Sequence, residues 1–188
     1  MSSHHIIRDE QEPPVLVFQL NDNWGALSEI LGWFPILLID PALAATFDLK
    51  QTKIDGFMWR GSETQFTEND LFYEKNDLGH ALMDWMLKKN GDAVNIFCDQ
   101  KQMMDLFSQF KASSLTFSII FFTERGKYVL KPYSTYRKWL PKNFRLEVLR
   151  SEIKNVKNLA SIGKFYQVEE DGFVKIEVLD DLVLIGEN

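Results

Sequence analysis

The chain has 188 residues, 45% of them hydrophobic and 13% aromatic, with a formal net charge of −6. This length suits one domain with its own core, and the hydrophobic content excludes an intrinsically disordered protein. The one cysteine, Cys98, cannot form an internal disulfide, so we expect a cytoplasmic protein rather than a secreted, disulfide-stabilised one. No apolar stretch approaches the roughly 20 residues that span a bilayer, so we expect no membrane partner.

Residues 1–14 are mostly polar and end in two prolines. We therefore expect a flexible N-terminal arm over 1–14 and a single globular domain over 15–188. His4 and His5 lie in this arm, where no fixed geometry would hold further ligands, so they do not indicate a metal site.

The first half of the chain alternates short apolar runs with amphipathic stretches. The apolar runs predict buried strands, and apolar residues at helical spacing predict helices. The predicted strands cover 15–20, 36–40, 53–61 and 92–98, and the predicted helices cover 24–34, 41–47, 67–77, 77–90 and 99–110.

The predicted helix 77–90 has the clearest pattern. Its apolar stripe, which includes Leu82 and Trp85, predicts a core-facing side, and Gly91 can supply a left-handed stop. Asp22 or Asn23, Asp40 and Asp99 stand before predicted helices, where their side-chain oxygens can cap the free N–H groups.

The second half of the chain is richer in predicted strands. These cover 114–122, 127–133, 165–169 and 173–178, with turns at 124–127 and 170–172 that predict two hairpins. The stretch 141–163 predicts a long helix, with Leu149, Ile153 and Val156 on its inner side. The whole pattern predicts an α/β or α+β fold: a single domain with a mixed sheet, packed helices and C-terminal hairpins.

Charge is unevenly distributed along the sequence. The segment 125–157 contains ten basic and two acidic residues, a net charge of +8, which leaves −14 for the remainder. Within it, the stretch KPYSTYRKWLPK combines cations with aromatic residues spaced so that a helical turn would align them. Its candidate binding residues are Lys131, Tyr133, Tyr136, Arg137, Lys138, Trp139 and Lys142. The alternative is a solvated connection whose aromatic side chains point inward.

A second candidate binding pair is Trp59 and Arg60, because these residue types are enriched at binding hot spots. The alternative is an ordinary strand, with Phe57 and Trp59 on one face and Met58 and Arg60 on the other. Cys98 follows a predicted strand and precedes a helix, but the neighbouring Asp99 opposes a thiolate.

The sequence contains no phosphate-binding glycine loop, zinc pattern or calcium loop, so we predict no catalytic residue, no metal site and no cofactor. The leading hypothesis is a small non-catalytic protein that acts by occupying a protein partner, as an inhibitor, an immunity-like protein or a chaperone. The alternative is an enzyme or module that binds a phosphate-bearing ligand or nucleic acid through segment 125–157. The sequence gives no indication of the oligomeric state.

Overall fold

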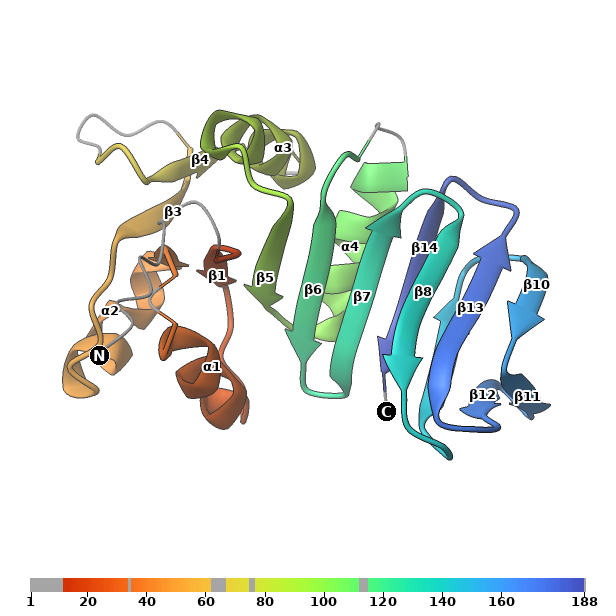
Figure 1. Cartoon of the computed structure of the whole chain (residues 1–188). Helices are drawn as coiled ribbons and strands as arrows, with labels where there is room; N and C mark the ends of the chain where they lie inside the picture. The colour runs from red at the N-terminus through yellow and green to blue at the C-terminus, as the bar shows by residue number, and fades with distance from the viewer. Residues whose placement is uncertain (1–11, 34, 62–66, 75–76, 112–114, 188) are drawn as a thin grey trace, which may run out of the picture.

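The computed structural model describes residues 12–33, 35–61, 67–74, 77–111 and 115–187 (Figure 1). The helical elements are α1 (Trp24–Leu31), η1 (Pro41–Leu43), α2 (Ala44–Leu49), α3 (Leu78–Lys89) and α4 (Gln100–Lys111). The strands are β1 (Val15–Val17), β2 (Leu37–Ile39), β3 (Gly56–Arg60), β4 (Leu71–Tyr73), β5 (Ala93–Phe97), β6 (Ser118–Thr123), β7 (Gly126–Pro132), β8 (Thr135–Leu140), β9 (Arg145–Leu149), β10 (Ile153–Lys157), β11 (Leu159–Ile162), β12 (Phe165–Val168), β13 (Gly172–Val178) and β14 (Leu182–Glu187).

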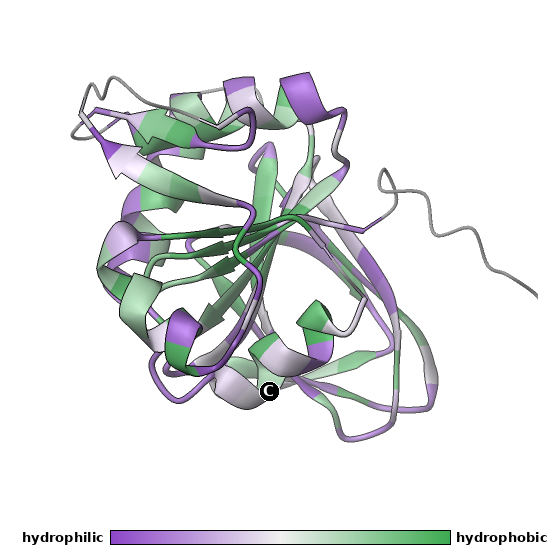
Figure 2. Cartoon of the chain, turned by 90° about the vertical axis from the view of Figure 1, so that its left-hand side faces the viewer, coloured by the Kyte–Doolittle hydropathy of each residue, from purple (hydrophilic) through white to green (hydrophobic). Residues whose placement is uncertain are grey.

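Strands β1 to β6 form the parallel part of a large mixed sheet, in the order β6-β5-β1-β2-β3-β4. Alternate side chains of these strands enter different cores, as the two-residue repeat of a strand requires. Leu16 and Leu38 pack with α3 and α4, whereas Val15 and Ile39 pack with α1 and α2. Helices therefore cover both faces, and Figure 2 shows hydrophobic strands gathered between them.

The second half of the chain extends this sheet and adds another layer. β7 pairs antiparallel with β6, and the sheet continues in the order β7-β14-β9-β12-β11. A separate three-stranded sheet, in the order β10-β13-β8, packs against it and encloses a third core. β7 and β14 are buried on both faces, because Leu130 and Leu184 face the helices while Val129 and Val183 face the small sheet.

The structure confirms the predicted α/β class, the single domain with a mixed sheet and most of the predicted elements. Trp85 and Leu82 lie in the core, with exposed fractions of 5% and 0%. Two of the three predicted caps are present: the Asp40 side chain accepts a hydrogen bond from the Ala42 N–H, and Asp99 accepts one from the Gln102 N–H. The third is not, because Asn23 precedes α1 without a side-chain cap hydrogen bond. Residues 1–11 of the predicted arm lie outside the described residues.

The predicted helix over 141–163 is wrong. This stretch forms β9, β10 and β11, and the chain crosses from the large sheet to the small one after β9. Arg150 and Asn158 have φ angles of 53° and 58°, a left-handed backbone that interrupts any helix through this region. Pairing of β9 with β14 and β12, which are distant in sequence, outweighs the local helical pattern.

Three smaller expectations also need correction. The stretch 67–77 contains strand β4 rather than a helix. Asn90, not Gly91, adopts the left-handed conformation that ends α3. The turn at 170–172 connects strands of two different sheets and does not form a hairpin, whereas the turn between β6 and β7 does.

Across the described part of the chain, no helix is long and apolar enough to cross a membrane.

Candidate ligand site at the carboxyl edge of the parallel strands

The strand order defines a position where an open α/β sheet commonly binds ligands. From β1 the chain builds outward to β4, then returns to place β5 on the other side of β1. Ligands in such sheets bind outside the carboxyl ends of the strands, near the point where the order reverses. The residues at these ends include Phe18, Asp40, Arg60, Tyr73 and Cys98.

Several of these side chains lie close together. The ring of Tyr73 packs edge-on against Phe18, with ring centroids 6.3 Å apart. Burial raises the pKa of the Tyr73 hydroxyl, the negative charge of Asp40 raises it further, and the positive charge of Arg60 opposes both. The phenol at the end of β4 is therefore influenced by a carboxylate at the end of β2 and a guanidinium at the end of β3.

Arg60 and Tyr73 also line a cleft of about 590 Å³ beside α4. Its other lining residues are Leu78, Lys101, Gln102, Asp105, Leu106, Ser108 and Gln109. Within the described ranges, neither Arg60 nor Lys101 forms an ion pair. The cleft thus contains two cations from different elements that no described residue neutralises by direct pairing.

The N-terminus of α4 is already occupied by carboxylates. Asp99 accepts a hydrogen bond from the Gln102 N–H at 2.7 Å, and Glu124 accepts one from the Gln100 N–H at 3.2 Å. An anion in the adjacent cleft would therefore be held by side chains rather than by the free N–H groups of this helix.

Cys98 lies at the same edge but is fully buried. Burial raises the pKa of its thiol strongly, and the negative charges of Asp99 and Glu124 raise it further. Because the thiolate is the reactive form, Cys98 is poorly suited to be a nucleophile. We expect native protein to react with a thiol reagent at least about 100-fold more slowly than denaturant-unfolded protein, since labelling then depends on transient opening. Equal rates would contradict this assignment.

The predicted pair Trp59 and Arg60 is divided between two faces of β3. Trp59 packs against Phe57 with ring centroids 5.4 Å apart, and Met58 enters the core on the other side. The side chains of β3 thus alternate as in an ordinary strand, which was the alternative prediction for this stretch. The binding role of Arg60 stays a prediction, and Tyr73 and Lys101 join it as candidates. Tyr73 was missed because its strand was predicted as a helix, although strand ends are a recognisable signal for ligand sites.

The basic and aromatic stretch 131–142 is not gathered into one site. Its aromatic residues do not share a face, because β8 is a strand: Tyr136 is buried, whereas Tyr133 and Trp139 are 75% and 55% exposed. Lys131 donates a hydrogen bond to Ser118, and the Lys142 N–H donates one to Asp171. Their function in binding stays a prediction.

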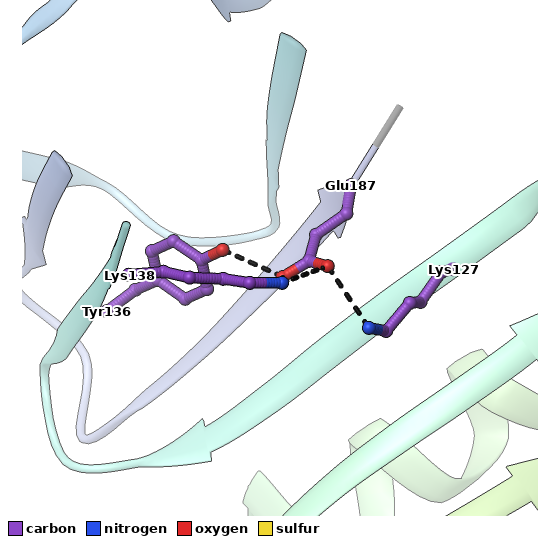
Figure 3. Close-up of polar contacts among 4 residues, drawn as sticks. All are labelled: Lys127, Tyr136, Lys138 and Glu187. Atoms are coloured by element: carbon purple, nitrogen blue, oxygen red, sulfur yellow. Dashed lines mark hydrogen bonds and ion pairs between the residues drawn. The ribbon is translucent and has the colours of Figure 1, made fainter. Parts of the chain in front are cut away.

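Tyr136 and Lys138 belong to a polar cluster between the two sheets (Figure 3). The Tyr136 hydroxyl donates to Glu187 Oε1 at 2.8 Å, and Lys138 Nζ lies 2.8 and 2.7 Å from the two carboxylate oxygens. Lys127 Nζ lies 3.3 Å from Glu187 Oε2. Glu187 is nearly buried, so this cluster joins β8 of the small sheet to β14 and β7 of the large one.

Metal-ligating side chains are not clustered: the part of the chain that the structure describes has no group of three or more histidine, cysteine, aspartate or glutamate residues placed to hold an ion. His80 pairs with Asp77 at 2.7 Å on the exposed side of α3. His4 and His5 lie outside the described residues.

Comparison with known proteins identifies the fold. No family model matches the sequence, and no curated protein matches it. A solved thiamine pyrophosphokinase from Bacillus subtilis is similar in structure, with a TM-score of 0.63 and 11% identity over 94% of this chain and 98% of that one. A protein from Lactobacillus plantarum has a TM-score of 0.63 and 9% identity, covering 93% of this chain and 97% of that one.

A thiamine pyrophosphokinase from Geobacillus thermodenitrificans has a TM-score of 0.59 and 9% identity, with 93% and 95% of the two chains covered. The chain therefore has a thiamine pyrophosphokinase-like fold. This finding contradicts the leading hypothesis of a non-catalytic inhibitor, immunity-like protein or chaperone, because the named neighbours are ligand-binding enzymes.

Proposed function

We propose that this protein binds a small phosphate-bearing ligand in the cleft between the carboxyl ends of β3 and β4 and helix α4. The observation that carries the proposal is the pair of cations, Arg60 and Lys101, that line one cleft without ion-pair partners in the described ranges. The position at the carboxyl edge of a parallel sheet supports it independently. This ligand class was the alternative hypothesis from the sequence, and the proposed site differs from segment 125–157, to which that hypothesis assigned it.

The chemistry of the lining residues fits such a ligand. A guanidinium binds phosphate oxygens in a bidentate manner, and a lysine ammonium adds a mobile point charge. Asp105 lines the same cleft, and its carboxylate favours a ligand that also carries a positive or hydrogen-bond-donating group. Two of the structural neighbours are named thiamine pyrophosphokinases. Thiamine pyrophosphate is a compound of this kind, since it combines a cationic ring with phosphates. We further propose a cytoplasmic location, supported by the free, buried Cys98.

Calorimetric titration with thiamine pyrophosphate, ATP, pyrophosphate and thiamine tests the proposal. We expect the phosphorylated compounds to bind and Arg60→Gln to weaken the tightest of them at least about 10-fold, because hydrogen bonds to charged groups contribute about 1.5–3 kcal/mol. Lys101→Gln should have an effect in the same direction.

Arg145→Gln is the matched control, since Arg145 is an exposed arginine on β9, outside the cleft. It should bind the ligand as the parent protein does. Equal affinities for the parent and the Arg60→Gln and Lys101→Gln variants would overturn the proposed site. Absence of saturable binding by any phosphorylated compound would overturn the proposed function.

A further inference from the structure

The small sheet of β10, β13 and β8 lies on the right-hand side of Figure 1. Its outward face presents an ordered set of side chains to solvent. On β8, Tyr136 and Leu140 pack against the large sheet, and on β13, Val174, Ile176 and Val178 do so. The residues that alternate with them point outward. Strand pairing aligns the outward residues in rows that cross the three strands β10, β13 and β8.

One of these rows consists of cations. Lys157 pairs in register with Lys175, and Lys175 pairs with Arg137. Adjacent strands lie about 4.8 Å apart, and like charges directly opposite one another destabilise a sheet. Glu177, in the next row, forms an ion pair with Lys175 at 2.5 Å. Arg137 and Lys157 form no ion pair with any described residue, so the row keeps an excess of positive charge.

The row beside the cations is aromatic. Phe173 pairs in register with Trp139, and the two side chains are 58% and 55% exposed. The Arg137 guanidinium lies 4.9 Å from the centroid of the Phe173 ring, which connects the two rows. Two large exposed aromatic side chains next to an unbalanced cation row form a surface that both an anionic group and a planar ring can contact.

We propose that this face, formed by Arg137, Trp139, Lys157, Phe173 and Lys175, binds single-stranded nucleic acid. Phosphates would lie along the cation row and bases would stack on the aromatic row, the combination that sequence-tolerant single-strand binding uses. An acidic polypeptide would engage the cations but leave the aromatic row without a partner group. The face belongs to the small sheet, whereas the cleft of the proposed function lies at the carboxyl edge of the parallel strands, so the two proposals are independent.

Fluorescence anisotropy of a labelled 20-nucleotide oligothymidylate, measured over a salt series, provides the test. We expect Trp139→Ala to weaken binding by about 10-fold, in line with the effect of removing one stacking aromatic residue. Arg137→Gln with Lys157→Gln should weaken binding and reduce the slope of log affinity against log salt by about 0.7 for each phosphate that the variant no longer binds. Trp139→Tyr, which keeps an aromatic face, should restore most of the affinity.

Three variants serve as controls. Tyr133→Ala removes an exposed aromatic side chain from the turn after β7, outside the two rows, and Lys88→Gln removes an exposed lysine from α3. Both should bind the oligonucleotide as the parent does, and so should Arg60→Gln, which separates this surface from the cleft. Circular dichroism and thermal unfolding check that every variant is folded.

Three results would overturn the proposal. The first is no binding of the oligonucleotide at low salt. The second is unchanged affinity in both the Trp139→Ala and the Arg137→Gln, Lys157→Gln variants. The third is sensitivity to the charge variants alone, with polyglutamate competing as well as the oligonucleotide, which would identify an acidic polypeptide as the occupant.

Discussion

Replacement of Trp85 by alanine is expected to lower the free energy of unfolding by about 3–5 kcal/mol, the range for truncating a buried large aromatic side chain. Trp85 is 5% exposed in the core between α3 and the sheet. Its indole N–H also donates a hydrogen bond to the Asn69 carbonyl at 3.1 Å, so the substitution removes packing and leaves a polar group unpaired.

A denaturant titration measures this effect. An unchanged m-value would show that the variant exposes the same surface area on unfolding as the parent protein does. Leu87→Ala is the matched control on the same helix, because Leu87 is 64% exposed and its loss should change stability by no more than about 0.5 kcal/mol. A Trp85→Ala effect below about 1 kcal/mol would contradict the assignment of Trp85 to the core, since it lies well under the usual range.

The Glu187 cluster should produce the second largest effect. Glu187→Gln removes the negative charge toward which Lys127, Lys138 and Tyr136 converge. We expect a loss of about 2 kcal/mol, in the range for hydrogen bonds to charged groups. The loss is smaller than for a fully buried pair because the two lysine side chains are 39% and 40% exposed and can move into water. Glu169→Gln, an exposed carboxylate, should leave the unfolding midpoint unchanged.

The same cluster predicts how stability depends on pH. Burial alone would raise the pKa of Glu187, but hydrogen bonds from Lys138 and Tyr136 and the charge of Lys127 outweigh it, so the pKa lies below its ordinary value of 4.5. A carboxyl group with a lowered folded-state pKa stabilises the protein above its unfolded-state pKa, and this contribution is lost as pH falls through the folded-state value.

The difference in stability between the parent and Glu187→Gln should therefore stay constant from pH 7 to about pH 5 and shrink at lower pH. Denaturant titrations of both proteins at a series of pH values measure it. A difference that grows as the pH is lowered would show that the carboxylate is not stabilised by these partners.

Local pattern in the sequence was sufficient where neighbouring residues decide the structure. The stripe of α3 and the caps Asp40 and Asp99 depend on contacts within a few residues, so helical spacing and side-chain chemistry predicted them. The apolar runs of β1, β2 and β5 are buried on both faces, which a continuous hydrophobic stretch signals directly. The α/β class follows from their alternation with helices.

Pairing between strands that are far apart in the sequence determined the rest of the structure. The stretch 141–163 carries a helical pattern, but β9 forms between β14 and β12, and only the folded chain brings those partners together. The same is true of the two candidate sites. Arg60 and Lys101 come from separate elements, and the cation row joins Arg137 and Lys157 to Lys175, a residue outside the basic segment. The sequence by itself determined the class of fold and which charged and aromatic residues are available. Strand register, which depends on contacts between residues distant in the sequence, determined which of these side chains share a surface.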